Sequence, residues 1–514
     1  MKKTVFTLLT ILCAPVLLSA QSAQNRLTIN ADMGRHQISR HIYGHFSEHL
    51  GHCIYGGIWV GKDSSIPNTN GVRTDIIDAL KKIKIPNIRW PGGCFADEYH
   101  WKDGIGPAAD RPSMINTHWG GVVEDNSFGT HEFLDFCEAI DAEPYVSANV
   151  GSGTVEEMAD WVEYINSDED TPMTRLRRQN GRDKSWGVKY WAVGNENWGC
   201  GGDMTPEYYS DLYRRFAIYC RNYGENRLFK VACGASDYDY NWQEVVMQRV
   251  GRRMDGISLH YYTVKGWRGS KGSATVFDEA EYFRTIKKGL GIEEVLDKHM
   301  TTMDKYDPEK RIALVVDEWG TWFDVEPGTN PGFLYQQSTL RDAFVAANTL
   351  NLFNERCERI KMANIAQTVN VLQAIILTKD EKMILTPTYH VFDMYQVHQD
   401  ATLLPSALTS VDYVFGDDKI PALNASCSRG SDGTINISIA NAHPQKAIDL
   451  ECELRGANVK TVSGRLLTAE NLSTHNTFDK PDNVKPVTFK GASLTGQNLT
   501  VKMPARSIVV LQLK

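Results

Sequence analysis

The sequence predicts an α/β fold, a (β/α)8 TIM barrel, followed by a C-terminal all-β domain of the sandwich or jelly-roll type. Short runs of β-branched, aromatic and aliphatic residues alternate with helical patterns from about residue 41 to about residue 397, which is typical of a parallel sheet covered on both faces. Beyond that point, short strands with alternating polar and apolar residues follow one another. A chain of 514 residues is too long for one compact core and has room for both domains.

Eight apolar runs are expected to form the barrel, and the segments between them have helical patterns. Some helices are predicted to open with a capping box, as at Thr154-Val155-Glu156-Glu157. The predicted strands are 41–44, 85–90, 144–150, 190–194, 229–234, 256–260, 312–316 and 363–369. The predicted helices include 74–83, 130–142, 154–166, 205–223 and 338–357. Strands of the C-terminal domain are predicted at 434–439, 450–454, 487–489, 499–503 and 508–513.

These patterns divide the chain into four parts. Residues 1–20 carry Lys2 and Lys3 before a short apolar run, which predicts a secretory signal peptide and an exported protein, periplasmic or extracellular. Cys13 lies in that run, but Leu12 precedes it where a lipoprotein signal needs a small residue, so a lipid anchor is disfavoured. Residues 21–40 are expected to add a strand to the β domain, 41–397 to form the barrel, and 398–514 the sandwich.

The overall charge and the cysteines exclude some classes of protein. The net charge is −8, from 55 basic and 63 acidic residues without a long run of either sign, so nothing points to nucleic acid or a membrane surface. Ten cysteines less Cys13 leave nine, an odd number that is scattered along the chain. They show neither a disulfide framework nor a metal-ligand spacing, and most are expected to be small buried hydrophobic residues.

Two of the predicted strands end in a carboxylate. Glu196 follows a strand-like run and Gly194-Asn195, and Glu318 follows the run 311–317. Catalytic residues of such barrels collect at the C-terminal ends of the strands, and a pair of carboxylates is what glycosidic hydrolysis requires. The alternative is that each glutamate caps the next helix or pairs with an arginine.

Other polar and aromatic residues fall at the same end of the barrel. Arg89 precedes a Pro-Gly-Gly turn and can hold a carboxylate, or form an internal ion pair. Asn195 can donate a hydrogen bond to a sugar hydroxyl such as the 2-OH. Tyr262 and Gln367 are either packing residues or members of a polar network, and Trp119 and Trp322 offer flat faces to a sugar ring or belong to the core.

A competing motif lies after the first strand. His45-Phe46-Ser47-Glu48-His49 matches H-x-x-E-H, a zinc-peptidase signature. Zinc would need both histidines on one face of a helix, but Gly44 and Gly51 bracket the segment and disfavour a long helix.

Five motifs in order resemble the α-L-arabinofuranosidases of glycoside hydrolase family 51, and the likeness runs from about Arg26 to Lys514. The motifs are 43–51, 89–95, Gly194-Asn195-Glu196, Asp317-Glu318-Trp319 and 363–367. The resemblance implies a barrel with a β-sandwich, a retaining mechanism, and no metal or cofactor. It makes Glu196 the acid/base and Glu318 the nucleophile. It further implies that Glu48, Arg89, Cys94, Asn195, Tyr262 and Gln367 line the pocket for a terminal arabinofuranose and that Trp322 borders it.

The implied function is exo-acting hydrolysis of terminal α-L-arabinofuranosyl residues from arabinan, arabinoxylan or arabino-oligosaccharides of the plant cell wall. Family members are often hexamers, so a homo-oligomer is a further expectation. Three alternatives stay open at this point. They are an endo-acting β-glucanase or xylanase on the same barrel, a carbohydrate-binding protein that has lost catalysis, and the zinc peptidase; the presence of both carboxylates argues against the second.

Overall fold

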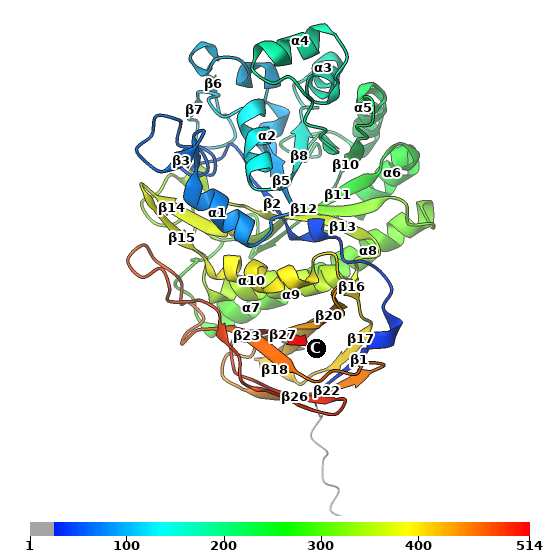
Figure 1. Ribbon diagram of the computed structural model, residues 1–514, viewed down its shortest axis with the longest axis vertical. Coiled ribbons are helices and arrows are strands. Elements are labelled where there is room, and N and C mark those ends of the chain that lie inside the picture. The colour runs from blue at the N-terminus through cyan, green and yellow to red at the C-terminus, as the bar shows by residue number, and fades with distance from the viewer. Residues whose placement is uncertain (1–24) are drawn as a thin grey trace, which may run out of the picture.

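A computed structural model describes residues 25–514, and the segment 1–20 that predicts a signal peptide lies outside this range. Figure 1 shows two layers of the molecule, with the barrel at one end and the C-terminal sandwich at the other. Helices α7 (Glu279–Leu290), α9 (Leu340–Glu355) and α10 (Pro387–Tyr395) lie between them. No helix in the range 25–514 combines the length and the apolar character that a bilayer crossing requires.

Eight parallel strands close the barrel in the order β10-β11-β12-β13-β2-β5-β8-β9, which confirms the predicted fold class. The first strand starts later than predicted, because Arg40–Tyr43 forms a 3-10 turn capped by Ser39. Strands β11 and β12 continue past the predicted ends and carry polar residues into the barrel mouth. The strands are β2 (Gly44–Phe46), β5 (Asn87–Trp90), β8 (Glu143–Ala148), β9 (Tyr190–Val193), β10 (Phe229–Ser236), β11 (Gly256–Val264), β12 (Ala313–Trp322) and β13 (Ile360–Ala366).

Local sequence signals explain where several helices begin. Thr154 accepts a hydrogen bond from the backbone N–H of Glu157 at the start of α3, and Thr205 caps α5, with Pro206 as its first residue. The helices are α1 (Thr74–Lys82), α2 (Thr130–Ala139), α3 (Val155–Asn166), α4 (Pro172–Gln179), α5 (Pro206–Tyr219), α6 (Tyr240–Val250), α7 (Glu279–Leu290), α8 (Ile292–Tyr306), α9 (Leu340–Glu355) and α10 (Pro387–Tyr395).

The N-terminal half of the barrel interior is filled by side chains. Tyr145, Tyr190, Val231, Val315 and Met362, all buried and contributed by five different strands, belong to one packed cluster. Such layers make the inside of a TIM barrel a solid core and not a pore. The interior therefore opens only at the C-terminal ends of the strands.

Two sheets form the sandwich, antiparallel except for one strand pair, and the N-terminal segment belongs to one of them. Strand β1 (Arg26–Asn30) lies between β17 and β22, antiparallel to the first and parallel to the second. The first sheet contains β17 (Ser406–Thr409), β1, β22 (Ile448–Arg455), β26 (Asn498–Met503) and β25 (Ala492–Thr495). The second contains β16 (Thr402–Leu403), β20 (Leu423–Arg429), β21 (Ile435–Asn441), β27 (Ser507–Leu513), β23 (Val462–Thr468) and β24 (Val487–Thr488).

Helix α9 joins the two domains. Every residue from Leu340 to Asn354 is buried, so this helix has no solvent-facing side. It packs against barrel strand β12 on one side and against β20 and β21 of the sandwich on the other. The hydrophobic residues of barrel, helix and sandwich form one continuous core.

Candidate active site

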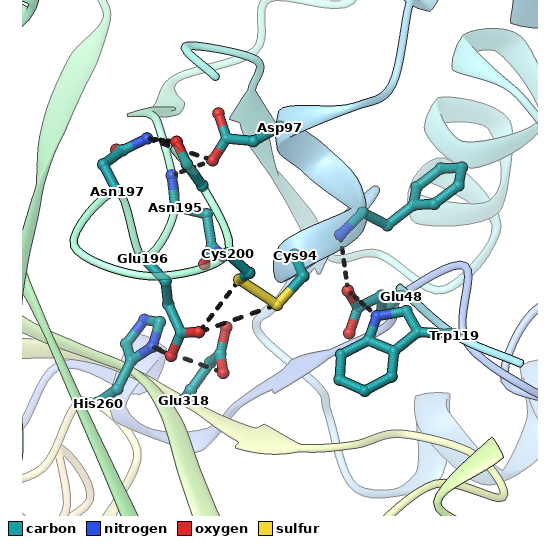
Figure 2. The surroundings of a disulfide bond; sticks show 12 residues. Glu48, Cys94, Asp97, Trp119, Asn195, Glu196, Asn197, Cys200, His260 and Glu318 are labelled. Carbon is teal, nitrogen blue, oxygen red and sulfur yellow. Dashed lines mark hydrogen bonds and ion pairs between the residues drawn. A yellow bond between two sulfur atoms is a disulfide. The ribbon is translucent and has the colours of Figure 1, made fainter. Parts of the chain in front are cut away.

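The two carboxylates predicted from the strand ends meet in the barrel mouth. Glu196 follows the last residues of β9, and Glu318 lies within β12. One side-chain oxygen of each lies within 4.8 Å of the other and of a ring nitrogen of His260. Figure 2 shows the three side chains pointing toward one another below a disulfide bond. His260 ends a predicted strand next to Tyr262, but the sequence pattern assigned it no role of its own.

The backbone around Glu196 is unusual. Glu196 has φ +41° and Gly194 has φ +91°, both in the left-handed region. A side chain at Gly194 would also clash with the Asn197 amide, because a Cβ at this position would lie 2.1 Å from Asn197 Oδ1. A strained conformation of a non-glycine residue persists only where its surroundings hold it, and such residues cluster at functional sites.

Asp97 holds this loop from behind. Its buried carboxylate accepts hydrogen bonds from the backbone N–H of Asn195 (3.0 Å), Val150 (2.7 Å) and Gly151 (2.8 Å). Burial outweighs these donors and raises the pKa of Asp97 to about 7. No sequence signal pointed to Asp97, because it lies in a 3-10 turn after β5 and its partners come from the ends of β8 and β9.

Glu318 is held by two donors. Arg89 donates to its Oε1 over 2.8 Å, and the Tyr262 hydroxyl donates to its Oε2 over 2.9 Å. Arg89 also donates to Asn195 Oδ1 (2.5 Å) and lies 3.5 Å from Asp317. Burial disfavours the guanidinium charge, but Asp317 and Glu318 outweigh it and raise the pKa of Arg89, so the charge persists at every physiological pH.

His260 bridges the acidic groups. Its Nδ1 lies 2.7 Å from Glu196 Oε1 and 3.5 Å from Glu318 Oε2, and its Nε2 lies 3.2 Å from Asp317 Oδ1. Burial lowers the pKa of an imidazole, but the three carboxylates outweigh it and raise the pKa of His260 to about 10. The side chain is therefore a cation between the carboxylates.

The environment of Glu196 favours its protonated form. Burial raises its pKa first, and the negative charge of Glu318 raises it further, while His260 and Arg89 act in the opposite direction. Glu318 has Arg89 and Tyr262 as direct donors, whereas Glu196 has only His260 among residues 25–514. Two carboxylates whose surroundings separate their protonation states are the usual sign of an acid and a nucleophile.

A third carboxylate, Glu48, forms the opposite wall. It accepts hydrogen bonds from the Phe95 backbone N–H (3.1 Å), Trp119 Nε1 (2.9 Å) and Gln367 Nε2 (3.1 Å). Burial and the charge of Glu318 outweigh these donors and raise the pKa of Glu48 to about 8. Trp119, which was expected to offer a flat face to a sugar or to belong to the core, thus also fixes a carboxylate.

These residues surround a cavity of 330 Å³, which is the size of a small-molecule site. A wider groove of 1170 Å³ lies beside α2, but it contains none of the residues that the strand ends bring together. Of the predicted site residues, Arg89 and Asn195 lie beneath the cavity and the others line it. Its lining includes Glu48, Cys94, Trp119, Glu196, Trp198, Cys200, Tyr262, Trp267, Glu318, Trp322 and Gln367.

A disulfide bond joins Cys94 and Cys200, which are 106 residues apart in the chain. The sulfur atoms of Cys94 and Cys200 lie 3.9 Å and 3.4 Å from Glu196 Oε2. Figure 2 shows the bond beside this carboxylate. The family resemblance implied that Cys94 lines the pocket, but nothing in the sequence indicated the bond. The other cysteines of residues 25–514 are buried free thiols, as expected, namely Cys53, Cys137, Cys220, Cys233, Cys357, Cys427 and Cys452.

The H-x-x-E-H segment does not form a metal site. His45 lies on strand β2, and its ring packs against Phe392 of α10 outside the barrel. Glu48 faces the cavity, and His49 accepts a hydrogen bond from Trp90 Nε1. The side chains thus diverge, because the segment is a strand and a turn where a zinc motif requires a helix.

Comparison with known proteins gives one consistent family. The profile of the family described as "Alpha-L-arabinofuranosidase 1 domain" matches residues 79–281, and that described as "Alpha-L-arabinofuranosidase C-terminal domain" matches residues 317–507. An intracellular exo-α-L-arabinofuranosidase of Bacteroides ovatus is 59% identical over 504 residues, which cover 98% of each chain.

Solved structures agree with this result. The GH51 arabinofuranosidase from Xanthomonas axonopodis pv. citri is 48% identical, with a TM-score of 0.94, and the match covers 96% of this chain and 100% of that one. An α-L-arabinofuranosidase from Thermotoga maritima, crystallised as an arabinose complex, is 30% identical, with a TM-score of 0.85 and coverage of 95% and 99%.

One expectation is contradicted. Residues 1–20 predict a signal peptide and an exported, secreted protein, but the Bacteroides ovatus relative, similar over nearly its whole length, is named intracellular. The prediction of export is therefore wrong. A pair of lysines before a short apolar run is a compositional signal, and composition alone does not establish that a segment directs export.

Proposed function

Because this chain belongs to glycoside hydrolase family 51 and is an α-L-arabinofuranosidase, we propose that it removes single terminal arabinofuranosyl residues with retention of configuration. A cavity of 330 Å³ has room for one terminal arabinofuranosyl residue and part of the leaving group. A relative that is 59% identical is named an exo-α-L-arabinofuranosidase, which supports exo action on arabinan, arabinoxylan or their oligosaccharides.

In the first step, a Glu318 carboxylate oxygen bonds to the anomeric carbon while the bond from that carbon to the leaving oxygen breaks. Protonated Glu196 gives its proton to the leaving oxygen. In the second step, ionised Glu196 takes a proton from water, the water oxygen bonds to the anomeric carbon, and the ester to Glu318 breaks. Arabinose leaves with its original configuration, and Glu196 is protonated again.

The separation of the two carboxylates carries this proposal. Retaining glycosidases hold them about 5 to 5.5 Å apart, and inverting enzymes about 6.5 to 9.5 Å apart, to make room for a water. One oxygen of Glu196 lies within 4.8 Å of one oxygen of Glu318, which fits the shorter, retaining separation and favours direct attack by Glu318.

The sugar hydroxyls have partners in the cavity lining and directly beneath it. Asn195 Nδ2 is buried and has no hydrogen-bond partner among the described residues, so it is free to donate to the 2-OH. Glu48 and the amide of Gln367 can bind hydroxyls on the opposite side, and Trp322 gives a flat face against the ring. Cys94 contributes a disulfide sulfur and no thiol donor.

Glu196→Ala tests the role of the acid. We expect kcat/KM for an arabinoxylo-oligosaccharide to fall by about 10²- to 10⁴-fold, because its leaving group needs a proton. Formation of the glycosyl-enzyme from 2,4-dinitrophenyl α-L-arabinofuranoside should change little, since dinitrophenolate leaves without one. Azide should accelerate turnover of this substrate and give an arabinosyl azide of retained configuration. An equal loss on both substrates would contradict the assignment, and Glu207→Ala, an exposed carboxylate at the start of α5, is the matched control.

The pH profile should show the raised pKa of Glu196. An acid must be protonated to act, so kcat/KM should persist well above the ordinary carboxyl value of 4.5 and then fall as rising pH deprotonates Glu196. Measured from about pH 4 to about pH 9 on a slow-leaving aryl arabinofuranoside, this alkaline limb should be present in the wild type.

Two variants identify the group that causes the alkaline limb. Glu196→Ala should remove it from the residual activity on the same slow-leaving aryl arabinofuranoside. Glu48 also titrates in this range, with a pKa of about 8, so Glu48→Gln should weaken binding but keep the limb. A limb that survives in Glu196→Ala and disappears in Glu48→Gln would mean that Glu196 is not the acid.

A further inference from the structure

Arg341 differs from the other fully buried arginines of the described chain. Arg73, Arg89 and Arg177 each lie within 3.0 Å of a carboxylate oxygen, whereas Arg341 has no carboxylate within 4.0 Å in residues 25–514. Asp342 is its neighbour, but the Asp342 oxygens accept hydrogen bonds from Thr339 and from β12. A buried charge without a counter-ion is costly, and proteins usually pair it.

The partners that Arg341 does have leave part of its guanidinium unused. Nη2 donates to the carbonyl oxygens of Ser273 and Ala274, both over 3.0 Å. Phe277 and Phe323 lie on its two faces, with ring centres 3.7 Å and 3.8 Å away. Nε is buried without a partner, and no hydrogen bond from Nη1 occurs within residues 25–514. The aromatic rings stabilise part of the positive charge through cation–π contacts, but they accept no hydrogen bond from Nε or Nη1.

The side chain lines a cavity of 140 Å³ that has a strongly positive lining. At about 30 Å³ per water, this volume holds roughly four or five waters, enough for a small ion. Glu281 is the acidic residue of this lining, and it lies 4.0 Å from Lys265. The basic residues of the lining are Lys265, Lys271, Arg284, Lys288 and Arg341.

We propose that this cavity binds a small oxyanion, an inorganic phosphate or the carboxylate of a uronic acid, with Arg341 at its base. Arg284 and Lys271 would close over the anion from α7 and from the loop before it. Guanidinium and ammonium groups form charge-assisted hydrogen bonds with both kinds of oxyanion. Asp342 and Glu281 favour the Arg341 charge without touching it, and the anion would supply the direct contact that they do not make.

The oxyanion cavity lies behind one wall of the active site. On β11, Tyr262 lines the catalytic cavity and the next residue, Thr263, lines the oxyanion cavity. Lys271 lines the oxyanion cavity, and its Nζ lies 5.8 Å from the centre of the Trp322 ring, which lines the catalytic cavity. Lys271 therefore lies between the two cavities. The loop 265–278 carries Lys271 and also Trp267, which is half exposed and lines the catalytic cavity. A bound anion would therefore fix a loop that borders the catalytic cavity.

Thermal unfolding of the full chain tests the proposal. We expect sodium phosphate or sodium glucuronate to raise the unfolding temperature of the wild type saturably by a few degrees, because a ligand that binds only the folded state stabilises it. Sodium chloride at matched ionic strength controls for general salt effects. A response to phosphate alone would assign an inorganic anion, and a response to glucuronate alone a uronate. No saturable response to either, beyond that of chloride, would overturn the proposal.

Variants locate the site. Arg284 is exposed and has no ion-pair partner in the described chain, so Arg284→Ala should fold normally and weaken anion binding at least several-fold, as measured by isothermal titration. Arg284→Lys should restore part of the affinity. Arg252→Ala, which removes an exposed arginine from the other end of the barrel, should bind like the wild type. If Arg284→Ala and Arg252→Ala bind the anion equally well, the site lies elsewhere and the proposal fails. These readouts do not depend on arabinofuranosidase activity.

Discussion

Glu318→Ala should lower kcat/KM for an aryl α-L-arabinofuranoside by about 10⁴- to 10⁶-fold, the loss typical when a nucleophile is removed. The proposed first step forms a bond to Glu318, so no covalent intermediate can form without it. Burst kinetics and mass spectrometry of the enzyme with a slow substrate should show a glycosyl-enzyme in the wild type and none in the variant. Glu326→Ala, a carboxylate on the loop after β12, should keep wild-type activity.

Azide provides a second readout for the same variant. It can occupy the space that the Glu318 carboxylate leaves, attack the anomeric carbon directly, and give an arabinosyl azide of inverted configuration. Retained configuration from Glu318→Ala would show that another group still forms the covalent intermediate. An arabinosyl azide of inverted configuration from Glu196→Ala would mean that Glu196 is the nucleophile and Glu318 the acid.

Arg89→Ala should reduce both stability and the rate of glycosyl-enzyme formation. The guanidinium is buried and contacts Glu318, Asp317 and Asn195, so its removal leaves two buried carboxylates without their main counter-ion. Breaking such a pair from one side costs about 3 to 5 kcal/mol of stability. Losing a donor to Glu318 and the fixed orientation of Asn195 should lower the rate by a further factor of about 10² to 10³.

Two variants separate these effects. Arg177 is also fully buried and pairs with Asp168, far from the cavity, so Arg177→Ala should lose stability but keep its rate per folded molecule. Arg89→Lys keeps the positive charge but loses the planar, forked arrangement of N–H donors. Its stability and its rate of glycosyl-enzyme formation should therefore lie between those of the wild type and Arg89→Ala. Denaturant unfolding and the pre-steady-state burst measure the two quantities. A normal burst in folded Arg89→Ala would show that Arg89 does not support the attacking carboxylate.

The sequence was most informative at the strand ends. A barrel strand is a short apolar run. A charged residue directly after it stands out, because burying a charge without a partner is costly. This contrast located Glu196 and Glu318, and the closed barrel then explains why residues 122 positions apart in the chain (318 − 196) meet. The start of the first strand was misplaced because Ile42 and Tyr43 are residues typical of strands, whereas Arg40–Tyr43 forms a 3-10 turn.

Other members of the site depend on contacts that sequence periodicity does not encode. Asp97 is identified only by the three backbone N–H groups that converge on it from the ends of β8 and β9. His260 belongs to an apolar run and shows its role only when Glu196 and Asp317 are placed beside it. The pairing of Cys94 with Cys200 likewise requires the loops after β5 and β9 to be adjacent.

The buried position of α9 decides what kind of unit the sandwich is. Accessory sugar-binding modules are usually attached by an exposed linker, and evolution can exchange them between enzymes without disturbing either partner. Here a helix of the barrel is covered on one side by β12 and on the other by β20 and β21, and β1 brings the start of the described chain into the same sandwich. Exchanging the sandwich would require a new surface for α9 itself. The sandwich is thus a structural part of the barrel and not a portable attachment.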